Sequence, residues 1–248
     1  HSLLVQSGER RFVVRVDGID PGQHGISRQV EWRALQHAAA AGIAPAPRYF
    51  NPELGTLVCD YLVPDQQPGK QPLEDIANLL RSIHALPTVH LRLDIEQRLH
   101  RYERRAARGA HPIAPGALAL GAKIRAAAAA VPAADHPPAL CHNDLLAPNR
   151  LYRNGALVAL DWEYAAMGVP LYDLAVVAAG VALGEAQFIG LLGAYLTREP
   201  NPAEQALVAA HSLTYRYLEL LWYLVHPGRA DDGPLLEQRL ESLSSLLA

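Results

Sequence analysis

The sequence predicts an α+β protein whose strands are concentrated before residue 64 and whose helices dominate afterwards. The opening segments, HSLLVQ and RRFVVRV, are rich in β-forming residues and flank a short turn, which is typical of a β-hairpin. Half of the 248 residues are apolar and 19% are charged, a composition that allows a sizeable core. We therefore expect two lobes, a small β-rich lobe over residues 1–64 and a larger helical lobe over residues 65–248.

The first lobe is expected to hold one helix and two further strands. Apolar residues recur at helical spacing over residues 27–41, Ser27 can cap the start of this helix, and a glycine marks its end. Two short strands are expected at residues 48–50 and 56–61. The stretch 63–72 is rich in Pro, Gln and Gly, so we interpret it as the connection between the lobes.

The second lobe is predicted to be helical apart from residues 139–161. This stretch has the pattern of a short apolar strand, a polar loop and a hairpin that turns at Asn154 and Gly155. The other segments have helical periodicity. Helices are expected at residues 73–85, 91–108, 117–130, 171–183, 185–196, 202–225 and 235–247.

Composition and charge exclude several classes of protein. The net charge is −3 and no base-reading motif accompanies the scattered basic residues, so we expect no nucleic-acid partner. Cys59 and Cys141 lie in apolar runs outside any CxxC pair, which indicates buried reduced thiols. No apolar stretch reaches the roughly 20 residues of a membrane helix. With no secretory signal visible, we expect a cytoplasmic protein without membrane partners. The chain opens in mid-strand at His1, which indicates a portion of a longer protein.

Polar residues interrupt the apolar β segments between residues 140 and 163. Because the hairpin folds back on itself, it can return Asp161 to the neighbourhood of Asp144 and Asn149. These oxygen ligands would form a hard site suited to Mg²⁺. Phosphoryl transfer needs such a site, with one further carboxylate free to accept the hydroxyl proton. The alternative is a capped loop in which Asp144 and Asn149 are turn residues.

The motifs HNDLLAPN and LDWEYA resemble the catalytic loop and the metal-binding segment of the choline kinase and aminoglycoside phosphotransferase superfamily. The segments FVVRV, RQVEWRAL, CDYLVP and LYDLA extend the resemblance over nearly the whole chain, and the last contains a stabilising aspartate, here Asp173. The resemblance implies a two-lobed protein-kinase-like fold, with ATP and Mg²⁺ as cofactors. It also implies that a Gly-rich phosphate loop should precede His1, so that the first lobe is truncated at its start.

The resemblance implies a role for each matching residue of the catalytic segments. Asp144 would be the catalytic base or the group that orients the acceptor hydroxyl. Asn149 and Asp161 would hold Mg²⁺, and Glu163 would assist the metal directly or through water. His142 would brace the loop.

The resemblance also implies the nucleotide contacts. Arg15 would contact phosphate, and Glu31 would orient Arg15. Arg suits this position because its guanidinium binds phosphate through two hydrogen bonds. Asp60, Tyr61 and Leu62 would form the hinge that meets adenine through its backbone.

One face of the predicted helix 202–225 offers an indication of the acceptor. His211, Tyr215, Glu219 and Trp222 are spaced by four, four and three residues, so they share this face. A carboxylate between two aromatic rings suits a cationic amine. The alternative is that Tyr215 and Trp222 are ordinary packing residues.

The leading hypothesis is a kinase for a small, hydroxylated and cationic substrate such as choline, ethanolamine or thiamine. A sugar or aminoglycoside phosphotransferase of the same fold is the second hypothesis. The third is a nucleotide-binding pseudokinase without turnover. The sequence does not predict an oligomeric state.

Overall fold

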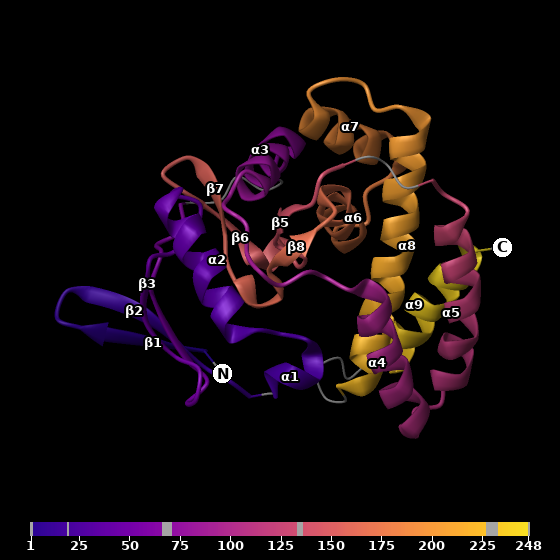
Figure 1. Cartoon of the computed structure of the whole chain (residues 1–248), viewed down its shortest axis with the longest axis horizontal. Helices are drawn as coiled ribbons and strands as arrows, with labels where there is room; N and C mark the ends of the chain where they lie inside the picture. The colour runs from indigo at the N-terminus through magenta and orange to yellow at the C-terminus, as the bar shows by residue number, and fades with distance from the viewer. Residues whose placement is uncertain (1, 19, 66–70, 133–135, 227–232, 248) are drawn as a thin grey trace. The chain divides into compact units, whose positions relative to one another are not determined.

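The computed structural model describes residues 2–18, 20–65, 71–132, 136–226 and 233–247. It confirms an α+β fold with a small antiparallel sheet and a larger helical part (Figure 1). The middle of the predicted connection between the lobes, residues 66–70, lies outside the described residues.

The chain forms two compact units, each built from two separate segments. The first unit consists of His1–Leu93 and His136–Pro200, and the second consists of Asp94–Asp135 and Asn201–Ala248. The expected lobe boundary at residue 64 divides the chain differently, and it stays a prediction.

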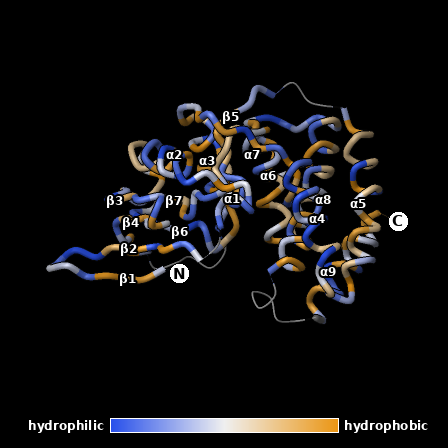
Figure 2. Tube along the Cα trace, turned by 60° about the horizontal axis from the view of Figure 1, so that its bottom comes forward, coloured by the Kyte–Doolittle hydropathy of each residue, from blue (hydrophilic) through white to orange (hydrophobic). Residues whose placement is uncertain are grey.

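The first unit contains a four-stranded antiparallel sheet in the order β1-β2-β4-β3. Its outer hairpin turns at Gly8, whose φ of 61° lies in the left-handed region that glycine adopts readily. Figure 2 shows hydrophobic residues along both strands of this hairpin, and Leu3 and Leu4 are exposed. The strands are β1 (Ser2–Ser7), β2 (Arg10–Val16), β3 (Pro47–Asn51) and β4 (Thr56–Asp60).

Helix α2 (Arg28–Ala40) follows the expected bounds closely. The Ser27 hydroxyl accepts a hydrogen bond from the Val30 amide, as an N-cap residue should. Val30 and Leu35 are among the residues of its buried face. The short helix α1 (Pro21–His24) was not predicted; Asp20 caps it by accepting a hydrogen bond from the Gly22 amide.

The stretch between residues 139 and 168 forms two small pairs of strands. The predicted hairpin is confirmed, and its turn places Asn154 and Gly155 at φ values of 53° and 78°. The strand that precedes the loop pairs with β8, which was not predicted because three residues carry no periodicity. The elements are β5 (Ala139–Cys141), η1 (Ala147–Asn149), β6 (Arg150–Arg153), β7 (Ala156–Ala159), η2 (Trp162–Tyr164) and β8 (Ala166–Gly168).

Three helices complete the first unit: α3 (Leu73–His84), α6 (Pro170–Gly180) and α7 (Glu185–Leu196). Every residue of α6 from Pro170 to Ala178 is buried, Asp173 included. A carboxylate in such a position needs polar partners, because burying an unpaired charge is costly.

The second unit is a helical cluster of α4 (Ile95–Arg108), α5 (Ala114–Ala129), α8 (Pro202–Val225) and α9 (Gly233–Ser245). Leu99, Tyr102, Ile124, Tyr217 and Leu221 are among the residues of its core.

The expected start of the second unit's first helix at residue 91 is wrong. Asp94 caps α4, and the residues before it are extended because Leu93 donates to the Met167 carbonyl and Met167 donates to the Leu91 carbonyl. The rest of the predicted helix is confirmed, and it begins with Ile95.

Cys59 and Cys141 are buried free thiols, as predicted. Among the described residues, no helix combines the length and the apolar character that crossing a membrane would require.

Candidate active site

A cleft of about 290 Å³ lies in the first unit. Apolar side chains from the sheet and from the β6–β7 hairpin line it, including Val13, Leu57, Leu151 and Leu160. A largely apolar cleft with a few charged groups is the common form of a small-molecule site. Its lining also includes the following predicted site residues: Arg15, Glu31, Asp60, Tyr61, Leu62, Asn149 and Asp161.

The loop after β5 brings Asp144 and Asn149 together. The Asn149 side-chain amide donates to the Asp144 carbonyl over 2.8 Å and to the Asp144 carboxylate over 3.0 Å. The Leu160 amide donates to the Asn149 carbonyl over 2.8 Å, so the backbone pairing continues past the hairpin toward Asp161. Asp144, Asn149 and the segment of Asp161 therefore lie in one neighbourhood, as the hairpin pattern predicted.

Two residues of the site have left-handed backbone conformations. Asn143 has a φ of 64° and Asp161 a φ of 57°. Such conformations are costly outside glycine and persist where the surroundings fix them, often at functional sites. The Asn143 side-chain amide donates to the Tyr164 carbonyl over 3.0 Å, which holds the loop against the segment after Asp161.

Asp173 fixes the backbone of the same loop from α6. Its two carboxylate oxygens accept hydrogen bonds from the His142 amide over 2.7 Å and from the Asn143 amide over 2.6 Å. Charge-assisted bonds of this length are strong. Asp173 is completely buried, so these bonds also satisfy much of its charge.

His142 lies beneath the loop. One ring nitrogen, Nε2, donates to the Leu160 carbonyl over 2.9 Å, and the ring packs on Trp162 with centroids 4.9 Å apart. Burial lowers the pKa of His142, so the ring is neutral at pH 7. These contacts fit the bracing role that the resemblance implied.

Arg15 connects the sheet, helix α2 and the segment after the hairpin. Its guanidinium donates to Glu31 over 2.7 Å and to Asp161 over 3.3 Å. The expected pairing of Arg15 with Glu31 is therefore present in the geometry. A positive group at this point of the cleft is available to a phosphate.

Arg28 is a second buried arginine, and it was not among the predicted site residues. It donates to Asp17 through two nitrogens, over 2.9 and 2.6 Å, to Glu31 over 2.7 Å and to Glu163 over 3.2 Å. A signal was available in the sequence. A basic residue in the first turn of a helix opposes the helix dipole, so it needs a compensating acidic partner.

The ion network carries an excess of negative charge. Two guanidinium groups, those of Arg15 and Arg28, meet four carboxylates. Burial and the charge of Asp161 raise the pKa of Glu163. Two positive charges would balance the excess, and the donors nearest the cleft are carboxylate and amide oxygens, the ligands that Mg²⁺ prefers. Asn149, Asp161 and Glu163 therefore fit a divalent cation.

The residues predicted to form the hinge lie at the end of β4. The Asp60 carboxylate accepts hydrogen bonds from Arg48, one of them over 2.7 Å, and these lower the pKa of Asp60. The Tyr61 amide donates to the Arg11 carbonyl over 3.0 Å, and Leu62 is buried. The predicted hinge segment is thus attached to the sheet.

The predicted acceptor residues lie on α8, in the second unit. Tyr215 is buried, and Glu219 forms an ion pair with Arg239 of α9. The Trp222 ring packs against His226, with centroids 4.5 Å apart. Glu219 and Arg239 line a cavity of about 200 Å³ within this unit. The role of these residues in acceptor binding stays a prediction.

The fold and the site together define a kinase-like phosphotransferase. Residues 2–208 match the phosphotransferase enzyme family, and the chain belongs to this family. It is thus an enzyme, as the sequence predicted.

Solved structures with a similar fold include choline kinases. A choline/ethanolamine kinase family protein from Mesorhizobium loti is 25% identical, with a TM-score of 0.78 over 99% of this chain and 85% of that one. The choline kinase LicA from Streptococcus pneumoniae is 21% identical, with a TM-score of 0.76 over 99% of this chain and 89% of that one. Aminoglycoside phosphotransferase APH(2'')-Ib is 15% identical, with a TM-score of 0.62 over 99% and 92%.

A curated relative matches over a shorter stretch. Protein LicA of Haemophilus influenzae is 30% identical over 87 residues, which are 34% of this chain and 33% of that protein. The match thus spans about a third of the length of this relative.

Proposed function

We propose that the chain transfers the γ-phosphoryl group of ATP to the hydroxyl of a small amino alcohol such as choline, ethanolamine or thiamine. The observation that carries the proposal is one cleft lined by the Arg15–Glu31 pair, Asn149 and Asp161, with Asp144 hydrogen-bonded to Asn149. Similarity to the choline/ethanolamine kinase family protein from Mesorhizobium loti supports the acceptor class, and a LicA structure in complex with AMP supports a nucleotide in the cleft. The cytoplasm, where ATP is abundant, is the compartment we propose.

The proposed chemistry assigns the proton to Asp144. The acceptor oxygen attacks the γ-phosphorus, the bond from phosphorus to the β,γ-bridging oxygen breaks, and ADP leaves. The proton of the hydroxyl passes to the Asp144 carboxylate, which is partly exposed and hydrogen-bonded on one oxygen by Asn149.

The positive charge at the phosphates would come from two sources. Arg15, oriented by Glu31, would contact the phosphates. Mg²⁺, when bound by Asn149 and Asp161 with help from Glu163, would neutralise charge on the transferring group. Asp60, Tyr61 and Leu62 would receive the adenine.

The acceptor is proposed to be cationic. Tyr215, Glu219 and Trp222 provide the aromatic rings and the carboxylate that attract an ammonium group. Because Glu219 pairs with Arg239, an ammonium group would compete with that guanidinium for the carboxylate.

A panel of acceptors tests the proposal. ATP consumption is measured with choline, ethanolamine, thiamine, amino sugars and aminoglycosides. Turnover with the amino alcohols supports the proposal, and turnover with the sugars alone assigns the aminoglycoside alternative. Turnover with none, alongside intact nucleotide binding, would favour a pseudokinase.

Replacement of the proposed base is the sharper test. We expect Asp144→Ala to lower kcat by about 10³-fold, within the range for loss of a general base. Nucleotide affinity, measured by calorimetry, should change little because Asp144 lies outside the lining of the cleft. A near-normal rate in this variant would remove Asp144 from the mechanism.

A further inference from the structure

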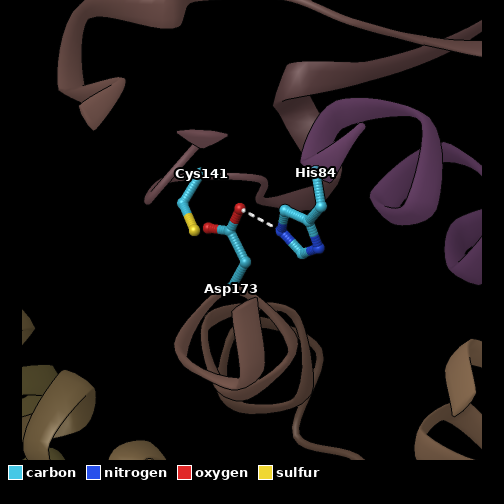
Figure 3. Close-up of side chains that lie close together, drawn as sticks. All are labelled: His84, Cys141 and Asp173. Carbon is cyan, nitrogen blue, oxygen red and sulfur yellow. Dashed lines mark hydrogen bonds and ion pairs between the residues drawn. The ribbon is translucent and has the colours of Figure 1, made fainter. Parts of the chain in front are cut away.

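A buried chain of hydrogen bonds extends from α7 to the catalytic loop. The Tyr195 hydroxyl lies 2.8 Å from Nδ1 of His84, and Nε2 of His84 lies 3.2 Å from a carboxylate oxygen of Asp173. That carboxylate also accepts hydrogen bonds from the backbone amides of His142 and Asn143. Figure 3 shows the central contact, with His84 reaching from α3 toward Asp173 on α6. The chain therefore ends one residue before Asp144.

The hydrogen bonds along this chain assign a tautomer to His84. Burial raises the pKa of Tyr195 to about 12, so its hydroxyl keeps the proton at pH 7. The hydroxyl can donate to Nδ1, which leaves the proton of the ring on Nε2, where it donates to Asp173. His84 then accepts one hydrogen bond at Nδ1 and donates one from Nε2. The Asp173 carboxylate thereby receives a third hydrogen bond, in addition to those from the two backbone amides.

Asp173 has few other means of support. Its side chain is fully buried, and the His84 side chain is 5% exposed. Within the described part of the chain, no Arg or Lys pairs with Asp173, and the His84 ring lies 3.2 Å from its carboxylate. The orientation of Asp173, and with it the position of the two amides, thus depends on a histidine 89 residues earlier in the chain.

A metal ion is a less suitable explanation of this cluster. The Cys141 thiol lies close to Asp173 in Figure 3, and the ligand atoms of His84, Cys141 and Asp173 are within 4.8 Å of one another. A metal-bound thiol must lose its proton, yet burial and the Asp173 charge raise the Cys141 pKa well above its usual value. The two amides already occupy the Asp173 oxygens at 2.6 and 2.7 Å.

We infer that His84 is a positioning residue of the phosphotransferase, acting through Asp173 to hold the backbone of His142 and Asn143 and thereby to place Asp144. Tyr195 fixes the tautomer of His84 that this role requires. The catalytic part of the inference rests on the proposed function. The structural part, the support of the two amides, can be tested without turnover.

Two variants separate positioning from packing. His84→Leu fills the space of the ring with an apolar side chain and removes the donor to Asp173. His84→Gln instead places an amide N–H near the position of Nε2. We expect His84→Leu to lower kcat about 10-fold with KM for ATP within twofold, since small misplacements of a reacting group slow the chemical step. His84→Gln should recover most of the rate.

His37→Leu is the matched control. His37 is a half-buried histidine in the last turn of α2, as His84 is the last residue of α3, and its replacement should leave kcat unchanged. Equal losses of rate in His84→Leu and His84→Gln would contradict the inference, since that result would assign His84 to packing.

Amide hydrogen exchange provides the readout that is independent of activity. In His84→Leu, the amides of His142 and Asn143 should exchange about 10-fold faster than in the wild type, while core amides of α6 keep their rates. Unchanged exchange at both amides would overturn the inference even if the wild type turned over no tested acceptor. If the wild type is inactive but exchange responds as expected, the proposed function fails and the support by His84 stands.

Zinc titration tests the metal alternative. We expect no rise in Tm when Zn²⁺ is added to the reduced protein. A rise that disappears in Cys141→Ala would assign the cluster to a metal and overturn the inference.

Discussion

Arg28 shows how one buried cation can organise the site without entering the cleft. Its side chain is 7% exposed, and its guanidinium binds acidic groups from three separate segments, those of Asp17, Glu31 and Glu163. Glu31 is itself 2% exposed and shared with Arg15. Removal of Arg28 would leave buried carboxylates with half of their positive partners.

We therefore expect Arg28→Met to lower the free energy of unfolding by about 3 kcal/mol, the usual loss when one partner of a buried ion pair is removed. Urea denaturation measures the change. Arg33→Met, at an exposed position of the same helix, is the control and should be nearly neutral. A neutral Arg28→Met would show that solvent satisfies the carboxylates.

Asp161 is expected to act on nucleotide binding rather than on the proton. Its side chain is 45% exposed and forms an ion pair with Arg15 over 3.3 Å. In Asp161→Ala, Mg²⁺ should no longer strengthen ADP binding, because an oxygen ligand is lost. Calorimetric titration of ADP with and without Mg²⁺ measures this, and an unchanged Mg²⁺ effect would exclude Asp161 as a ligand.

His211 makes stability depend on pH. Burial lowers the pKa of His211 from 6.5 to about 4, so the folded chain disfavours the protonated ring. The unfolded chain binds the proton below pH 6.5, and the folded chain does so only below about pH 4. The stability that the neutral ring provides is therefore complete above pH 6.5 and is lost as the pH falls toward 4.

The variant His211→Gln should accordingly lose less stability than the wild type between pH 7 and pH 4. Comparison of the two urea midpoints across this range isolates the histidine from the carboxylates, which both chains share. His90→Gln, at an exposed position, should follow the wild-type curve. Parallel curves for wild type and His211→Gln would contradict the prediction.

At the scale of elements, the β6–β7 turn is the clearest case in which the sequence determines the geometry. Gly155 has a φ of 78°, and an added Cβ would meet nothing within 4 Å. Gly155→Ala should therefore cost about 1 kcal/mol through backbone strain alone. Gly184→Ala is the matched control, since Gly184 has open space and a φ of −69°. Equal stability of both variants, measured by urea denaturation, would show that the turn relaxes.

The elements differ in how far the sequence alone could predict them. Helix α2 and the β6–β7 hairpin carry local signals, a cap at Ser27 and an Asn-Gly turn, and their bounds are confirmed. Strand β8 and the extended residues before Asp94 are fixed by pairing with each other, a contact between distant segments. Local periodicity cannot report such a contact, so the expected start of α4 was wrong.

The residues of the site likewise divide into those that the sequence predicts and those that only contacts between distant segments reveal. Asp144, Asn149 and Asp161 belong to motifs that the sequence presents in order. Arg28 and His84 lie on ordinary amphipathic helices, and their importance comes from the acids that the fold places beside them. A buried partner is visible only when both chain segments are in place.

At the scale of the whole molecule, the family and the fold are those that the sequence predicts. The identity of the acceptor has to be decided by experiment. The choline/ethanolamine kinase family protein from Mesorhizobium loti has a higher TM-score with this chain than the aminoglycoside phosphotransferase APH(2'')-Ib, 0.78 against 0.62. Fold likeness alone does not decide a substrate. The acceptor panel described above makes that decision.

The interleaving of the two units has a consequence for biosynthesis. The second unit joins residues 94–135 to residues 201–248, and the Tyr217 hydroxyl donates to Glu103 over 2.8 Å inside it. As a chain leaves the ribosome, α4 and α5 emerge long before α8, whose apolar face is part of their core. During translation, the leucines of α4 and α5 therefore stay exposed to solvent until α8 has been synthesised. A chaperone that binds these helices in the meantime would improve the yield of native enzyme.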